Sequence, residues 1–318
     1  MANILKRPEG WIPERLVTPE AAYRERRRFL KQMGLAGAGL LAAQGLMADD
    51  AKAPAKPATK KYPAKRNPEY DPKLNLSDER FVATYNNYYE FSTQKELVHR
   101  LASNLTIDPW AIEIDGLVEK PLKLDVRELI EMFDLEERVC RFRCVEAWGM
   151  IVPWTGFPLA KLLEKVQPKA EAKFVKFQTA LRPNEMPGVA RLRAYPWPYT
   201  EGLRIDEAMH PLSFVATGLY GKPIFRQNGA PIRLVVPWKY GYKSIKSIVK
   251  IEITREQPKT LWETLSPEEY PFESNVNPAL PHPRWSQAFE RMIDTGERVR
   301  TLPYAGYGDQ VAKLYKKD

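Results

Sequence analysis

The sequence predicts an α+β fold, with mixed sheets and peripheral helices. Segments that alternate apolar and polar residues are interspersed with segments of helical periodicity, without a regular βαβ repeat. No G-x-G-x-x-G motif occurs, so a dinucleotide-binding Rossmann fold is not expected. The chain has 318 residues, of which 44% are hydrophobic, and this is enough for one large core.

Local patterns define the expected elements in chain order. Alternation of apolar and polar side chains predicts strands over residues 110–118, 174–179, 233–237 and 248–254. Apolar residues at helical spacing predict helices over residues 96–105, 125–132, 157–166 and 286–293. The second helix has the clearest start, because Asp125 followed by Glu128 forms a capping-box pattern.

An export signal is expected over residues 1–50. Arg26-Arg27-Arg28-Phe29-Leu30-Lys31 fits the twin-arginine pattern R-R-x-F-L-K, although Glu25 stands where such signals usually have Ser or Thr. The apolar stretch 33–48 that follows is too short for a comfortable membrane span. We therefore expect export to the periplasm by the twin-arginine translocase. A basic amphipathic helix and an uncleaved anchor are the alternatives.

The remaining chain divides into a linker and a folded body. Residues 51–73 are rich in Ala, Lys and Pro and are expected to form a disordered linker, and residues 74–318 a single domain. The first 68 residues hold 14 Lys and Arg against 6 Asp and Glu, whereas the other 250 hold 35 against 34. Because the body is nearly neutral, broad nucleic-acid binding is not expected.

Cys144 is the main candidate for chemistry. Its segment also carries Arg141, Arg143, Glu146 and Trp148, and nearby cations would lower the pKa of the thiol. A thiolate in such surroundings suits a transition metal. An inert buried cysteine and a Cys–His nucleophile are the alternatives.

The other cysteine and the three histidines give weaker signals. Cys140 lies four residues before Cys144, so a disulfide between them would close a very short loop, and a free buried thiol is the simpler expectation for Cys140. The histidines have no metal-type spacing, which makes a histidine zinc site improbable: His99, His210 and His282.

Two further stretches could bind a ligand. In the run 227–246, Arg233 enters an apolar strand, and Lys239, Lys243 and Lys246 crowd a glycine-containing loop that could hold a phosphate. A solvated hairpin with surface lysines explains this loop equally well. The stretch 85–91 has Asn and Tyr side chains that could bind a polar heterocycle, or it could be an ordinary turn.

These stretches together resemble the catalytic subunits of the periplasmic protein-methionine-sulfoxide reductases, the MsrP family, within the sulfite oxidase fold superfamily. The resemblance runs from about Asn67 to the C-terminus and includes the leader type. It rests on several long motifs in the expected order, namely 143–148, 201–204, 206–212, 228–246 and 282–288.

The resemblance implies a sulfite-oxidase-type molybdopterin-binding fold with one catalytic domain. Cys144 would ligate molybdenum beside a molybdopterin without an appended nucleotide. Arg233 would pair with the cofactor phosphate. Ser244 stands where the family has glycine, and serine should serve there if its φ angle is negative. The implied cofactor contacts are Asn86, Tyr89, Glu90, Thr179, Asn228, Arg233, Ser244, Ile245 and Lys246.

The implied activity is the reduction of methionine sulfoxide in exported proteins, by oxygen-atom transfer to Mo(IV). Glu146 is a candidate proton donor because it lies two residues from the metal ligand. Electrons would come from a haem-binding membrane subunit of the MsrQ type and the quinone pool, and the catalytic chain would be a monomer. Sulfite oxidation by the same cofactor and a non-enzymatic exported binding module are the alternative functions.

Overall fold

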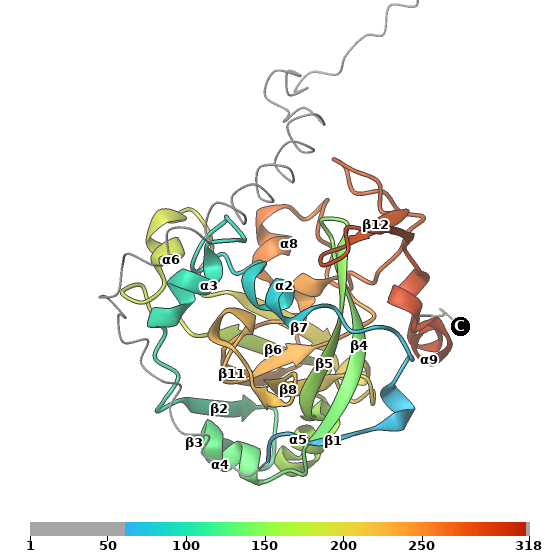
Figure 1. The fold of residues 1–318 in the computed structure, drawn as a ribbon. Helices are drawn as coiled ribbons and strands as arrows, with labels where there is room; N and C mark the ends of the chain where they lie inside the picture. The colour runs from blue at the N-terminus through green and yellow to red at the C-terminus, as the bar shows by residue number, and fades with distance from the viewer. Residues whose placement is uncertain (1–60, 316–318) are drawn as a thin grey trace, which may run out of the picture. The chain divides into compact units, whose positions relative to one another are not determined.

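The computed structural model describes residues 61–315, which fall in one compact unit of the chain. The expected signal peptide (1–50) and the linker residues 51–60 lie outside the described residues. The described part consists of an eight-stranded and a five-stranded sheet with short helices around them (Figure 1). The α+β prediction is therefore confirmed.

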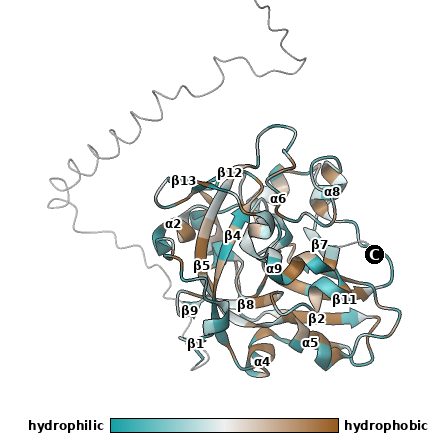
Figure 2. Ribbon diagram, turned by 90° about the vertical axis from the view of Figure 1, so that its right-hand side faces the viewer, coloured by the Kyte–Doolittle hydropathy of each residue, from teal (hydrophilic) through white to brown (hydrophobic). Residues whose placement is uncertain are grey.

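The eight-stranded sheet is built around an antiparallel hairpin of its two longest strands, β4 (Glu136–Cys144) and β5 (Trp148–Pro158). Figure 2 draws β5 as mostly hydrophobic, whereas β4 also carries hydrophilic residues. The path β1-β4-β5-β12-β13 is extended by β8, which pairs with β5, β9 and β10. The other strands are β1 (Lys65–Arg66), β8 (Phe214–Leu219), β9 (Lys222–Pro223), β10 (Arg233–Val235), β12 (Phe289–Met292) and β13 (Arg298–Arg300).

The five-stranded sheet has the order β3-β2-β11-β6-β7. Its strands are β2 (Ala111–Gly116), β3 (Leu122–Asp125), β6 (Phe174–Thr179), β7 (Thr200–Arg204) and β11 (Ile248–Thr254). Strand β11 runs parallel to β2 and antiparallel to β6, so the sheet is mixed. The strands expected over 110–118, 174–179, 233–237 and 248–254 are all present, two of them with the expected bounds.

The helices are short, and the longest described one has eight residues. Asp125 and Glu128 form the expected capping box at the start of α4, and Thr260 and Glu263 form another at α8. Within residues 61–315, no helix has the length and apolar character needed to cross a membrane. The α-helices are α2 (Glu79–Thr84), α3 (Val98–Leu101), α4 (Val126–Glu131), α5 (Leu159–Val166), α6 (Pro187–Arg191), α7 (Ile205–Ala208), α8 (Leu261–Leu265) and α9 (Gly308–Val311).

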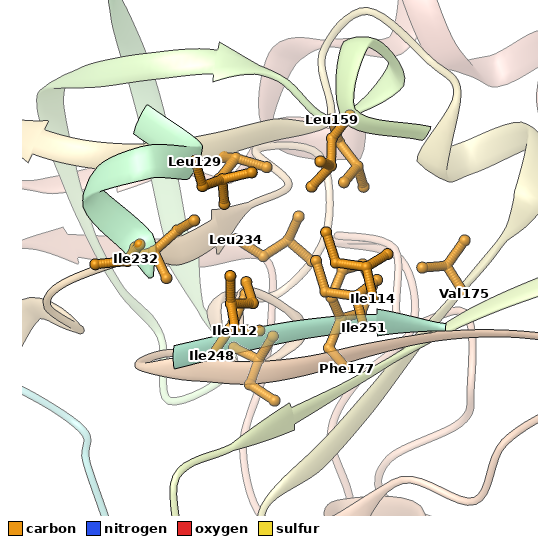
Figure 3. Close-up of a cluster of buried hydrophobic side chains, with 14 of the residues drawn as sticks. Ile112, Ile114, Leu129, Leu159, Val175, Phe177, Ile232, Leu234, Ile248 and Ile251 are labelled. Carbon is orange, nitrogen blue, oxygen red and sulfur yellow. The ribbon is translucent and has the colours of Figure 1, made fainter. Parts of the chain in front are cut away.

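The largest core lies on one face of the five-stranded sheet. Ile112 and Ile114, two residues apart on β2, present their side chains to the same side as Phe177 and Ile251 from β6 and β11 (Figure 3). Leu159 of α5 covers this face together with other helix residues. Burying each such side chain stabilises the fold by about 1.5–3 kcal/mol, which holds the sheet as a rigid support.

One predicted element is wrong. Residues 286–293 do not form a helix, because Phe289–Met292 is strand β12, which pairs with β5 and β13. Glu290 and Met292 are buried while their neighbours are more exposed, so the burial has the period of two that a strand requires. In so short a segment, pairing with an existing sheet overrides the local helical pattern.

The packed body begins earlier than residue 74. Strand β1 pairs in parallel with β4, and the Tyr62 hydroxyl donates to the backbone oxygen of Thr217 at 3.0 Å. The Lys61 ammonium donates to the carbonyl oxygens of Ile130 and Phe133 at 2.9 Å, at the C-terminal end of α4. Residues 61–73 are thus bound to the body, which corrects this part of the expected disordered linker (51–73).

Candidate active site

A tight turn between β4 and β5 fixes the position of Cys144. Cys144 is the last residue of β4, and three residues lead to Trp148, the first of β5. Ala147 closes the turn with a φ of +62°, the left-handed conformation that commonly ends three-residue hairpin loops. The carbonyl of Val145 accepts hydrogen bonds from Trp285 Nε1 and Gln287 Nε2, both at 2.8 Å. The segment before β12 therefore anchors the turn.

The strand alternation separates the thiol from the two arginines near it in sequence. Arg141 and Arg143 both pair with the buried carboxylate of Glu290, at 2.6 and 2.8 Å. They do not activate the thiol as the sequence predicted, because alternate residues of a strand point to opposite faces. Burial, with the negative charge of Glu146, instead raises the pKa of Cys144 to about 12. The thiol therefore keeps its proton until a metal ion replaces it.

The disulfide and the Cys–His pair considered for the cysteines find no support in the structure. Cys140 and Cys144 are both free and buried. Four residues of extended strand separate their Cα atoms by about 13 Å, which is too far for a disulfide. None of the histidines is among the described residues that line the cavity at Cys144, so no Cys–His pair is formed there.

All of the residues predicted for the site surround one cavity of about 370 Å³. This volume is within the usual range for small-molecule and cofactor sites. The predicted residues come from the turn after α2, from β4 and the turn that follows it, from β6, from the 3-10 helix before β10 and from β10 itself, and from the loop before β11. They are Asn86, Tyr89, Glu90, Cys144, Glu146, Thr179, Asn228, Arg233, Ser244, Ile245 and Lys246.

Two amide side chains present unused acceptors to this cavity. The Nδ2 groups of Asn86 and Asn228 both donate to the carbonyl oxygen of Val82, at 2.9 and 3.0 Å. This shared contact fixes both amides, and it leaves both Oδ1 atoms buried without a hydrogen-bond partner in the described protein. Buried polar atoms are rarely left unpaired. A heterocycle with N–H donors, such as a pterin, fits this pair of oxygens.

Two cations in the cavity wall, Arg233 and Lys246, have no carboxylate at ion-pair distance among residues 61–315, although the charge of Glu90 acts on Lys246. Arg233 is buried and donates to the carbonyl oxygens of Asn228 and Ser244, both at 2.8 Å. Burial lowers the pKa of Arg233 to about 9. Burial and the charge of Arg233 also lower the pKa of Lys246. Because buried charges are stable only when compensated, this end of the cavity suits an anion such as a phosphate.

The other lysines of the predicted phosphate loop are used differently. Lys239 pairs with Glu207 and Lys243 with Glu201, both at 2.6 Å and fully buried. These two lysines therefore belong neither to a phosphate site nor to a solvated hairpin. Ser244 has a φ of −91°, so serine fits the backbone without strain, and its hydroxyl accepts a hydrogen bond from Val236 N.

The carboxyl group of Glu146 accepts hydrogen bonds. Asn87 Nδ2, Trp148 Nε1 and Lys95 Nζ all lie within 3.0 Å of its Oε2 atom. Burial alone would raise the pKa of Glu146, but these three donors outweigh it and lower the pKa. The group is ionised at neutral pH. Its contacts favour a positioning role over the predicted role as proton donor.

The predicted set of site residues omits several that complete the site, although some of them lie in the stretch 85–91. Asn87 Nδ2 lies 3.5 Å from Cys144 Sγ, and Lys95 neutralises Glu146. The doubled Asn86-Asn87 pair was a visible signal for the first of these. Nothing near Lys95 in the sequence marks it. Aromatic side chains from distant segments also line the cavity, among them Tyr85, Tyr88, Tyr195, Tyr199, Tyr242, Trp262, Tyr270 and Trp285.

Comparisons with known proteins agree with this geometry. Residues 99–262 match the oxidoreductase molybdopterin binding domain. The chain is 49% identical over 309 residues to the protein-methionine-sulfoxide reductase catalytic subunit MsrP of Xanthomonas campestris, covering 95% of this chain and 94% of that protein. It is 50% identical over 302 residues to the MsrP of Campylobacter jejuni, covering 95% and 97%.

Among solved structures, the sulfane dehydrogenase SoxCD of Paracoccus pantotrophus is similar, with a TM-score of 0.42, 16% identity, and coverage of 66% of this chain and 60% of that one. Two curated relatives are 49% and 50% identical to this chain over nearly its full length, and together with the domain match they identify the family. The chain belongs to the MsrP family of protein-methionine-sulfoxide reductase catalytic subunits.

Proposed function

We propose that this protein is a molybdenum-dependent reductase that repairs methionine sulfoxide in exported proteins. Cys144 holds the metal, and Asn86 and Asn228 contact the pterin of a molybdopterin without an appended nucleotide. Arg233 and Lys246 compensate the charge of its phosphate. When bound, the group supplies oxygen-atom transfer, in which the sulfoxide takes up two electrons and two protons and leaves as thioether and water.

The charged side chains nearest Cys144 are paired with one another, and this pairing carries the choice of substrate. Arg141 and Arg143 are tied to Glu290, and Lys95 is tied to Glu146. The side chain closest to the sulfur of Cys144 among its hydrogen-bond partners is the uncharged amide of Asn87. Sulfite is a dianion and would need converging free cations, whereas a sulfoxide is neutral and polar. This arrangement favours reduction of a sulfoxide over oxidation of sulfite.

The chain's own residues position the sulfur of Cys144. The carboxylate of Glu146 holds Asn87, whose Oδ1 atom is buried without a partner in the described protein. The amide can therefore bind a further donor near Cys144 without leaving Glu146. Val145 is fixed through its carbonyl by Trp285 and Gln287, so the turn that carries the sulfur is preorganised.

The cellular setting is part of the proposal. Residues 1–50 act as a twin-arginine signal, so the chain reaches the periplasm folded and loaded with cofactor. It works there as a monomer that receives electrons from a haem-binding membrane subunit of the MsrQ type and the quinone pool. Replacing Arg26-Arg27 by Lys-Lys should keep the protein in the cytoplasm, and quinol should reduce it only when membranes that contain the haem subunit are present.

A substrate comparison tests the activity. With a dye as electron donor, the holoenzyme should reduce methionine sulfoxide in an oxidised, unfolded protein and also free dimethyl sulfoxide. Supplied with an electron acceptor, it should oxidise sulfite much more slowly. Faster turnover of sulfite would establish the sulfite oxidase alternative. Binding of oxidised protein without any turnover by a molybdenum-loaded sample would instead establish a binding module.

A further inference from the structure

Aromatic side chains from separate segments form one wall of the cavity. Tyr89 follows α2, Trp262 belongs to α8, Tyr270 follows α8, and Trp285 precedes β12. The ring centroids of Trp262 lie 5.0 Å from Tyr89 and 5.1 Å from Tyr270. Figure 1 places α8, β12 and the turn between β4 and β5 at the same end of the molecule. We refer to Trp262, Tyr270 and Trp285 as the aromatic wall.

The aromatic wall is held rigidly, although it is not fully buried. Trp262 and Trp285 each keep part of their surface exposed. Trp285 stacks on His282 with ring centroids 3.9 Å apart, and its indole N–H is bonded to Val145. Tyr270 is also in contact with His282, at 5.9 Å between ring centroids. Because the rings are already ordered, little side-chain entropy is lost when a ligand covers them.

The border of the wall carries a compensated charge. Arg284 pairs with Glu269 at 2.7 Å, and the same carboxylate lies 3.1 Å from His282 Nε2. The wall therefore offers ring faces and paired charges, which suit uncharged apolar groups. Thioether and methyl groups pack well against aromatic rings. Arg284 and Lys95 each have a carboxylate partner, so neither offers an unpaired cation to a free anion.

The depth of the sulfur determines what part of a protein substrate reaches the wall. Cys144 is only 8% exposed, so a methionine sulfoxide side chain must enter the cavity to reach it. A methionine side chain is unbranched and short, and its backbone must then stay at the mouth. The residues on either side of the sulfoxide are held next to the aromatic wall, and only an extended segment can present them in this way.

We propose that Trp262, Tyr270 and Trp285 form a subsite for the apolar residues that flank methionine sulfoxide in an unfolded polypeptide. This inference rests on the proposed function and adds a sequence preference to it. Sulfoxides flanked by leucine or phenylalanine are preferred over those flanked by glycine or serine. Such segments are buried in folded proteins, so the subsite directs the enzyme to damaged proteins that have lost their fold.

Two peptides test the subsite, each with one methionine sulfoxide flanked by Leu and Phe or by Gly and Ser. In the holoenzyme, Trp262→Leu and Tyr270→Leu should each raise KM about tenfold for the apolar peptide, and much less for the polar peptide and dimethyl sulfoxide. Tyr70→Leu is the matched control, because Tyr70 is a half-buried aromatic residue that does not line the cavity. It should leave all three KM values within twofold.

Calorimetric binding of the apolar peptide separates the subsite from the activity. The wild type should bind this peptide about tenfold more tightly than the polar peptide, and Trp262→Leu should remove the difference. Equal binding of both peptides by the wild type, or equal KM increases for all substrates, would overturn the subsite. Tight selective binding without turnover would leave the subsite in place and refute the proposed function.

Discussion

Replacing Glu290 should destabilise the fold around the site strongly. Its side chain is completely buried and pairs with both Arg141 and Arg143, of which Arg143 is also fully buried. Glu290→Gln keeps the shape but removes the charge. Breaking a buried ion pair by removing one partner costs about 3–5 kcal/mol, because the other charge stays buried without compensation. For a domain of this size, the melting temperature should fall by roughly 10 °C.

An exposed ion pair provides the matched control. Glu79 pairs with Lys222 at 2.9 Å, but the two side chains are 37% and 57% exposed. Exposed pairs of this kind contribute less than about 1 kcal/mol, so Glu79→Gln should hardly change the free energy of unfolding. Urea unfolding of the two variants and the wild type at one pH, followed by fluorescence, measures both effects.

The Glu290→Gln change should also affect the turn that carries Cys144, and with it the molybdenum content. Arg143 also donates to the carbonyl of Cys144 and, at 2.7 Å, to Gln287, so the turn should loosen and the molybdenum content should fall. Adding Arg143→Met to Glu290→Gln should cost less than the sum of the single changes, because no unpaired arginine then remains at position 143. A loss of stability in Glu290→Gln no larger than that in Glu79→Gln would contradict the predicted cost of leaving Arg143 buried without its partner.

Three further predictions follow from single side chains. Glu146→Gln should lower turnover about tenfold without changing the shape of the pH profile between pH 5 and 8, because Glu146 is already ionised there. If the wild-type rate falls with rising pH and the variant loses this fall, Glu146 would instead be a proton donor. Burial lowers the pKa of His282 from 6.5 despite Glu269, so the contribution of this side chain to stability is complete above pH 6.5 and is lost as the pH falls. His282→Gln should therefore flatten the decrease in unfolding free energy between pH 7 and 5. An unchanged slope would contradict this. Cys140→Ala should cost about 1 kcal/mol in urea unfolding and leave the molybdenum content unchanged, and a loss of metal would show that Cys140 supports the site.

Most of the five-stranded sheet could be predicted from the sequence, because its strands are amphipathic and Ile112 and Ile114 alternate with polar neighbours. The central hairpin could not. Strand β5 is buried along nearly its whole length, so it shows no alternation, and β4 carries arginines that are unusual in a core. Arg141 and Arg143 are stable there only because Glu290, almost 150 residues later, lies against them.

The site residues could be predicted as a set, but their charge states could not. The motifs indicated which residues meet at the cavity. They did not indicate that Lys239 and Lys243 each have a buried glutamate partner, or that three donors converge on Glu146. Such pairings depend on contacts between distant segments. Periodicity within one segment carries no information about them.

The most direct test is the molybdenum content per chain of the purified protein, measured with its pterin content in the wild type and in Cys144→Ser. We expect about one molybdenum and one pterin per chain in the wild type, and a variant that folds normally but has lost its sulfoxide reductase activity. A wild-type sample free of molybdenum yet active, or a Cys144→Ser variant with full turnover, would contradict this expectation.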